Sequence, residues 1–215
     1  MSLWEYLKEE RSRLTELAIE HAQIVLMAVG IAVVFGVGLG VLTYRTNTPR
    51  IVALSVTGTF LTIPSLALYG FLLTILGLGT TTALVALVLY ALLPIVRNTI
   101  TGLREVDPAI VEAAQGMGMP RWRRLLRVEL PLAWPVILTG IRVSTQILVG
   151  IAAIAAIING PGLGKDIFRA LSRIGGANAV NQALAAVLAI IVLGLLLDLA
   201  FVLVGKLTTS KGIRD

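Results

Sequence analysis

Five long apolar stretches limit what this chain can fold into. They cover residues 22–44, 51–78, 81–96, 132–158 and 182–204. A helix of about 20 apolar residues crosses the roughly 30 Å of hydrocarbon in a bilayer, and the shorter third stretch needs polar neighbours to complete it. Because hydrocarbon offers backbone polar groups no other partners, a spanning segment must be helical or part of a closed barrel. The sequence therefore predicts an all-α integral membrane protein with five transmembrane helices.

The composition argues against most soluble and catalytic classes of protein. Hydrophobic residues make up 57% of the chain and charged residues only 14%, whereas soluble domains carry about 25% charged residues. The absence of cysteine excludes disulfides, iron–sulfur clusters and thiol nucleophiles. The single histidine, His21, argues against a histidine-based metal site or catalytic triad, and we interpret it as a polar residue at the membrane entrance. We expect no catalytic residue, no metal, no bound cofactor and no nucleic-acid partner.

The distribution of Lys and Arg predicts the orientation in the membrane. With the N-terminus outside, the cytoplasmic segments hold Arg45, Arg50, the arginines between residues 97 and 127, and the basic residues after position 205. The outer segments then hold the smaller share of the basic residues. Because cytoplasmic loops are enriched in Lys and Arg, this pattern favours an outside N-terminus and a cytoplasmic C-terminus.

This orientation gives one membrane domain with peripheral segments. Leucines at near-helical spacing between charges predict an amphipathic segment lying on the outer surface at the start of the chain. The expected parts are that segment (1–21), the transmembrane domain (22–206) with a cytoplasmic loop (97–131) and an extracellular loop (159–181), and a cytoplasmic tail (207–215).

Two features predict how the spans bend and pack. Pro64 lies inside the second apolar stretch, where a missing N–H and a ring clash should kink or interrupt the helix. Such breaks often line a path through a membrane protein. Gly36 and Gly40 lie four residues apart on the first stretch, a spacing that favours close contact with another helix.

The polar segment 97–131 has the pattern of a short helix held between sharp turns. Asp107 can cap a helix that begins at Pro108, and residues 109–115 then form two turns. Gly116 and Gly118 supply the stop. A second amphipathic stretch follows over residues 120–130, before Pro131 opens the next span. Such a helix suits docking into a groove of another protein.

The same segment resembles the EAA loop of permease subunits of binding-protein-dependent ABC importers. The resemblance is carried by Glu112-Ala113-Ala114, by Gly118, and by Val128-Glu129-Leu130-Pro131, with Val128 where isoleucine is usual. Runs outside the loop, at residues 63–68, 89–99, 140–142 and 162–164, resemble the osmoprotectant branch, which imports glycine betaine, carnitine, choline and related compounds. The similarity covers residues 21–206.

The resemblance implies a type I ABC importer permease core in a prokaryotic cytoplasmic membrane. Residues 108–118 would be a coupling helix in a cleft of a separate ATPase subunit, with Glu112 paired to a basic residue there. The implied partners are two ATPases that bind ATP and Mg, a second permease subunit of the same or a paralogous kind, and an extracellular substrate-binding protein. The coupling residues expected on this basis are Asp107, Pro108, Glu112, Ala113, Ala114, Gly118, Leu130 and Pro131.

Two charged residues lie within the spans. Arg142 and Asp198 are expected at similar depths, about 16 Å and about 12 Å from the cytoplasmic ends of their helices. Because an ionised side chain is costly in hydrocarbon, we expect an intramembrane ion pair, within one subunit or across a dimer, that fixes the register of the last two spans.

A cationic amine could be guided by aromatic and polar side chains near the helix breaks. The candidates for the translocation path are Ser65, Tyr69, Tyr90 and Asn98. Besides a membrane scaffold with no transport, two other functions stay open at this point. One is import of another small solute, such as an amino acid or a sulfonate, because the coupling loop does not report cargo. The other is a stand-alone secondary transporter or channel, although the chain shows no internal repeat.

Overall fold

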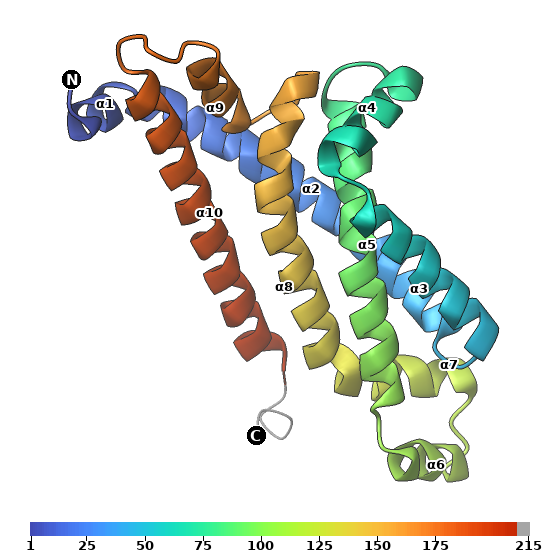
Figure 1. Cartoon of the computed structure of the whole chain (residues 1–215). Helices are drawn as coiled ribbons and strands as arrows, with labels where there is room; N and C mark the ends of the chain where they lie inside the picture. The colour runs from blue at the N-terminus through green and yellow to red at the C-terminus, as the bar shows by residue number, and fades with distance from the viewer. Residues whose placement is uncertain (210–215) are drawn as a thin grey trace.

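The computed structural model describes residues 1–209, and nearly all of them are helical (Figure 1). Of the expected tail 207–215, residues 210–215 lie outside the described part. The elements are α1 (Leu3–Glu9), α2 (Arg11–Thr43), α3 (Asn47–Thr62), α4 (Ser65–Leu76), α5 (Thr80–Arg104), α6 (Pro108–Gly116), α7 (Arg121–Arg124), the π-helix η1 (Leu125–Glu129), α8 (Leu130–Ile154), the 3₁₀-helix η2 (Ala155–Ile158), α9 (Gly164–Leu171) and α10 (Ala179–Thr208).

The expected membrane-spanning helices are confirmed, with one of them broken. Within residues 1–209, four helical segments are long and apolar enough to cross a bilayer, and α3 with α4 makes a fifth if the bent pair counts as one span. The helix direction bends by 100° between α3 and α4. Pro64 causes the break, because the residue before a proline is driven out of the helical region, and Ile63 accordingly has an extended backbone.

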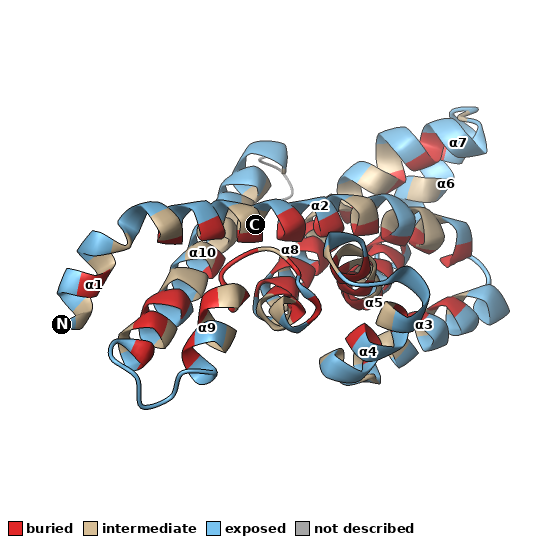
Figure 2. Ribbon diagram, turned by 90° about the horizontal axis from the view of Figure 1, so that it is seen from above, coloured by how far each residue is buried: buried red, intermediate tan, exposed pale blue. Residues whose placement is uncertain are grey.

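The helices form one layer backed by a long diagonal helix. Helix α5 packs most extensively against α8 and α2, and these three contribute most of the buried core. Seen from above, α2 runs along one side of the row formed by α10, α8, α5 and α3 (Figure 2). Helix α10 lies at one edge of the row, and only 6% of its most apolar window is buried within the chain.

Close contacts between glycine and a neighbouring helix bring α2 and α5 together. A Cβ added at Gly36 would lie 2.7 Å from Ile95, and one added at Gly40 would lie 2.6 Å from Thr99. Every larger side chain would therefore push the two helices apart. This confirms the interpretation of these glycines as a helix-packing face.

Several boundaries differ from the sequence prediction. Helix α2 begins at Arg11, so residues 11–21 belong to the same helix as the first span instead of forming a separate surface segment. Only α1, capped by Ser2 and Glu5, is separate. Pro131 lies in the first turn of α8, as expected for the residue that opens this span.

His21, interpreted from the sequence as a polar residue at the membrane entrance, lies in the interior of the protein. Its side chain is fully buried, and Nε2 lies 3.0 Å from the carbonyl oxygen of Val149. Gly162 packs directly on it, since an added Cβ there would lie 2.8 Å from His21 Cβ. The histidine therefore joins α2 to α8 and to the loop before α9.

Candidate functional site

The short helix α6 stands apart from the helical layer, at one end of the molecule (Figure 1). Its start is as expected, because a side-chain oxygen of Asp107 accepts a hydrogen bond from the Ala109 N–H at 2.8 Å and Pro108 occupies the first turn. Its end differs in detail. Gly116 is still helical, and Gly118 alone adopts the left-handed conformation, with φ of +76°. Both ends of α6 are thus fixed by local chemistry.

Most side chains of α6 face outward. Glu112 and Ala113 are exposed, whereas Ala114 is buried against the rest of the chain. Within residues 1–209, Glu112 forms no salt bridge. Ile110 and Met117 add exposed apolar surface, with 43% and 71% of their area accessible. The helix therefore presents one carboxylate and two apolar side chains to a partner.

The segment from α7 to the start of α8 holds a buried carboxylate that sequence reasoning missed. Glu129 is 2% exposed. It accepts hydrogen bonds from the Tyr44 hydroxyl at 2.7 Å, from Arg45 at 2.8 Å and from Arg124 at 3.1 Å. We refer to these four residues as the Glu129 cluster. Two of its members lie 84 or more positions away in sequence, so spacing along the chain gave no signal for it.

The surroundings of Tyr44 shift the pKa of its phenol. Burial raises its pKa, and the hydrogen bond to the Glu129 carboxylate raises it further, while the Arg45 guanidinium acts in the opposite direction. The net shift is upward, so the hydroxyl keeps its proton and acts as a donor.

Leu130 and Pro131 directly follow Glu129 in the sequence and lie in the first turn of α8, where Leu130 is half-buried and Pro131 is exposed.

Arg142 and Asp198 meet across α8 and α10. The guanidinium makes two bonds to the carboxylate, Nε to Oδ1 at 2.5 Å and Nη2 to Oδ2 at 2.6 Å. The side chains are 44% and 32% exposed within the single chain. One turn further along, Gln146 donates to the carbonyl of Gly194 at 3.0 Å, so the two helices share a line of polar contacts.

The four path candidates have mostly structural partners within the chain. The Tyr90 hydroxyl donates to the carbonyl of Ile63 at 2.6 Å, next to the break between α3 and α4. The Tyr69 hydroxyl donates to the carbonyl of Ile151 at 3.3 Å. Asn98 bonds the carbonyl of Pro94 in its own helix, and Ser65 is the half-buried first residue of α4.

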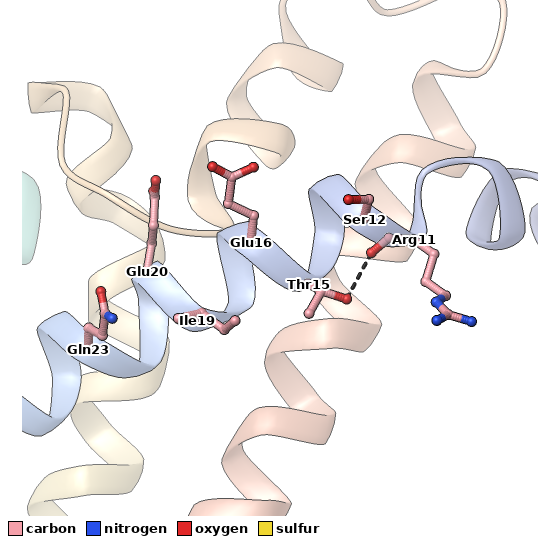
Figure 3. A pocket seen from close by; sticks show the side chains of 7 residues that line it. All are labelled: Arg11, Ser12, Thr15, Glu16, Ile19, Glu20 and Gln23. Carbon is pink, nitrogen blue, oxygen red and sulfur yellow. Dashed lines mark hydrogen bonds between the residues drawn. The ribbon is translucent and has the colours of Figure 1, made fainter.

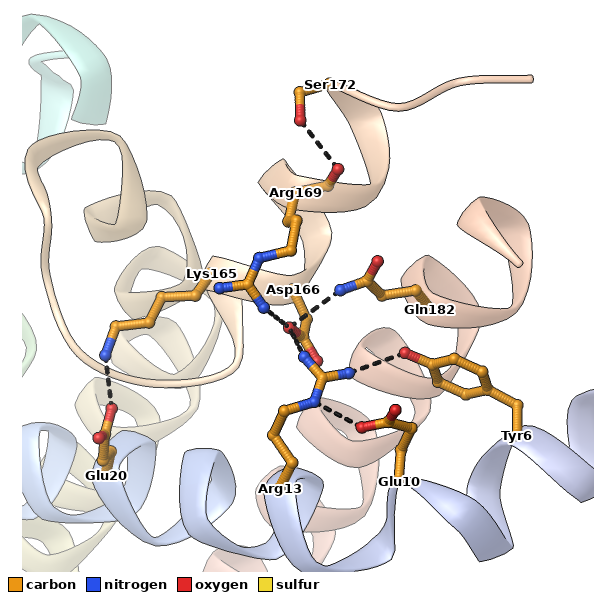
Figure 4. A network of polar contacts seen from close by, with 9 residues as sticks. All are labelled: Tyr6, Glu10, Arg13, Glu20, Lys165, Asp166, Arg169, Ser172 and Gln182. Carbon is orange, nitrogen blue, oxygen red and sulfur yellow. Dashed lines mark hydrogen bonds and ion pairs between the residues drawn. The ribbon is translucent and has the colours of Figure 1, made fainter. Parts of the chain in front are cut away.

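A second buried carboxylate lies at the other end of α2 (Figure 4). Asp166 on α9 is fully buried, and its Oδ1 accepts bonds from Arg13 at 2.6 Å, Arg169 at 3.1 Å and Gln182 at 3.1 Å. Arg13 also donates to the Tyr6 hydroxyl at 2.8 Å. We refer to these five residues as the Asp166 cluster. It joins α1, α2, α9 and α10, and the sequence gave no sign of it.

An open hollow along the first half of α2 is lined by seven residues (Figure 3): Arg11, Ser12, Thr15, Glu16, Ile19, Glu20 and Gln23. All of them come from one helix. A single helix cannot enclose a ligand, so we assign no binding site to this hollow. Among residues 1–209, no group of three or more His, Asp or Glu side chains is placed to hold a metal ion.

Known proteins with similar sequences are membrane permease components. The chain is 38% identical over 214 residues to the osmoprotectant import permease protein OsmW of Salmonella typhimurium, covering 97% of this chain and 98% of that protein. It is 36% identical over 201 residues to the glycine betaine/carnitine/choline transport system permease protein OpuCB of Bacillus subtilis, covering 91% and 88%.

A solved structure shares the fold. The permease-like chain in an inward-facing structure of the MetNI methionine ABC transporter superposes with a TM-score of 0.80, at 23% identity, over 98% of this chain and 100% of that one. The family of binding-protein-dependent transport system inner membrane components matches residues 32–209. With its spans, its EAA loop and these relatives in place, this chain belongs to the family of inner membrane components of binding-protein-dependent transport systems.

Proposed function

We propose that this permease carries a small quaternary-amine osmoprotectant, such as glycine betaine, carnitine or choline, in an importer driven by ATP. The functions of its relatives support this cargo, because OsmW is an osmoprotectant permease and OpuCB a glycine betaine, carnitine and choline permease. Both match along nearly the whole chain. Uptake of labelled betaine, carnitine and choline, each competed by the other two, tests the assignment; uptake of an amino acid or sulfonate alone would contradict it.

The observation that carries the mechanism is the geometry of α6. The helix is held outside the layer by the Asp107 cap and the Gly118 turn, and it exposes Glu112 between apolar side chains. We infer that α6 docks on a separate ATPase subunit, where Glu112 pairs with a basic side chain. ATP and Mg would bind in that subunit, and this chain would transmit the motion without catalysing a reaction. The remaining partners would be a second permease and an extracellular binding protein.

Co-purification with the ATPase tests the docking. Replacing Glu112 and Gly118 together by arginine should abolish recovery of the ATPase, because both the carboxylate and the left-handed turn are lost. Replacing the exposed Glu16 and Gly150, which lie far from α6, by arginine and alanine is the matched control and should leave recovery unchanged. If both variants recover as much ATPase as the unaltered permease does, α6 is not part of the interface.

The orientation follows from the same proposal. Residues 97–131 would lie in the cytoplasm with the C-terminal tail, and residues 1–21 and 159–181 would lie outside. Because the sequence has no cysteine, single cysteines report sidedness cleanly. An impermeant thiol reagent on intact cells should label Ala177→Cys and spare Met117→Cys, both of which are exposed positions. The reverse pattern would invert the topology.

We further infer that the Arg142–Asp198 pair fixes the register of α8 against α10, and that the break between α3 and α4 borders the path. Ser65, Tyr69, Tyr90 and Asn98 are the candidates for side chains along it. Reversing both charges, Arg142→Asp with Asp198→Arg, should restore part of the assembly lost in either single reversal. Absence of any recovery would exclude the pairing as the source of register.

A further inference from the structure

The Glu129 cluster lies between the docking helix and the long helix α2. Its carboxylate is 2% exposed and uses both oxygens: Oε2 accepts from Tyr44, Oε1 accepts from Arg124, and Arg45 reaches both at 2.8 and 3.1 Å. Tyr44 and Arg45 are the two residues that directly follow the last turn of α2. The end of α2 is therefore tied to a single buried negative charge.

The π-helix η1 creates this arrangement. Its closing bond runs from the N–H of Leu130 to the carbonyl of Leu125, five residues back. In an α-helix, side chains five residues apart point about 140° away from each other. The wider π turn brings Arg124 and Glu129, which are five apart, onto one face, where Arg124 Nε lies 3.1 Å from Glu129 Oε1. Such single-turn π segments are frequent at functional sites.

Arg124 also reaches the docking helix. Its Nη1 donates to the side-chain oxygen of Gln115 on α6 at 3.2 Å, while its Nε holds Glu129. Only 7% of this arginine is exposed. Because the guanidinium is planar and its donors have a fixed geometry, a displacement of one partner is passed to the other. A continuous polar chain thus runs from Gln115 through Arg124 and Glu129 to the end of α2.

We propose that Glu129 is a positioning residue that couples movement of α6 to α2 during transport. The inference rests on the proposed docking of α6 on an ATPase. When the ATPase displaces α6, Gln115 and Arg124 would shift Glu129, and Glu129 would carry Tyr44 and Arg45 with it. Because α2 crosses the whole molecule beside α5 and α8, a shift at this end reaches the outer side.

The test compares two substitutions of equal chemistry at the two ends of α2. Glu129→Gln and Asp166→Asn each remove one buried negative charge beside two arginines while keeping side-chain shape. The permease is reconstituted in proteoliposomes with its ATPase, its binding protein and glycine betaine. The measured quantity is the ratio of ATPase activity with loaded binding protein to basal activity, with the thermal midpoint of each complex recorded alongside.

We expect Glu129→Gln to lower this ratio by about tenfold, the size of a typical coupling free energy, while basal ATPase activity persists. Asp166→Asn should lower the thermal midpoint of the complex by as much as Glu129→Gln does. It should leave the ATPase ratio within about twofold of that of the unaltered protein. Equal ratios in both variants, whether reduced or not, would overturn the inference, because general destabilisation would then explain any change.

Arg124→Lys is the second variant and decides the matter if Glu129→Gln does not assemble. A lysine keeps the positive charge for Glu129 but cannot hold Gln115 at the same time. It should lower the ratio as well, and an unchanged ratio would overturn the inference. If the unaltered complex assembles but loaded binding protein does not stimulate it, the proposed function itself fails, and the inference with it.

Discussion

Helix α2 is tied to the rest of the molecule by a buried carboxylate at each end, and the two clusters behave as different kinds of joint. At its start, Asp166 gathers Arg13, Arg169 and Gln182 on one oxygen and so binds α2, α9 and α10 together. At its end, Glu129 uses both oxygens and continues through Arg124 to the exposed helix α6. Similar chemistry thus ties α2 to neighbouring packed helices in one place and to the exposed helix α6 in the other.

The difference lies in what the arginines touch next. In the Asp166 cluster, Arg13 also bonds Glu10 and Tyr6, and Tyr6 on α1 is buried against the rest of the chain (Figure 4). In the Glu129 cluster, Arg124 bonds the exposed Gln115 on α6, a helix that stands apart from the layer. In our proposal, a buried carboxylate transmits movement only when an arginine bonded to it also bonds a helix that can be displaced.

The largest expected effect is on stability, and it should be equal at the two ends. Asp166→Ala and Glu129→Ala each leave two arginines without their buried partner, which costs at most about 3–5 kcal/mol of unfolding free energy, because only Arg124 among these arginines is itself buried. Denaturant unfolding of the purified permease in detergent measures this. A loss confined to one variant would show that only one cluster is a structural joint.

Next in size is the support beneath the Asp166 cluster. Gly164 begins α9, and a Cβ there would lie 1.9 Å from the backbone oxygen of Ala153. Gly164→Ala should therefore lift α9 and cost about 3 kcal/mol, the upper part of the range for overpacking. Gly150→Ala, with nothing within 4 Å of the added Cβ, is the control and should not destabilise. Equal unfolding midpoints would mean that α9 is not seated on α8.

The tyrosines of the two clusters should differ by a smaller amount. Tyr44 donates to Glu129 and accepts from Arg45, whereas Tyr6 only accepts from Arg13. Tyr44→Phe should cost about 2 kcal/mol and Tyr6→Phe about 1 kcal/mol, because a hydrogen bond to a charged partner is worth more when both roles of the hydroxyl are used. The same detergent unfolding assay ranks them, and a reversed order would contradict the assigned donor and acceptor roles.

The smallest effect is expected at the rim of the Asp166 cluster. Lys165 pairs with Glu20 at 2.8 Å, and both side chains are more than a third exposed, at 37% and 34%. Exposed pairs of this kind contribute at most about 1 kcal/mol. Lys165→Ala should therefore shift the unfolding midpoint little at low salt and not at all at high salt. A loss as large as that of Asp166→Ala would show that the pair is part of the anchor.

Local rules were enough for most of the fold and for the two ends of helix α6. Apolar runs identified the spans, Pro64 the break, and Asp107 with Gly118 the two ends of α6, because each depends on neighbouring residues alone. Local rules did not reach what depends on tertiary contacts. Polarity alone did not show that the His21 ring is buried beside a carbonyl of α8.

The sequence by itself determined that this chain is a helical membrane protein with an exposed α6, since hydrophobicity, proline and glycine act over a few residues. The sequence also indicated that Arg142 and Asp198 meet, but only the tertiary structure decided which charges meet in the Asp166 and Glu129 clusters. Asp166 with Arg13, and Glu129 with Tyr44 and Arg45, are separated by 84 or more positions. The free energy of burying a charge depends on partners that folding brings close to it. These partners are distant in sequence, so no local pattern indicates them.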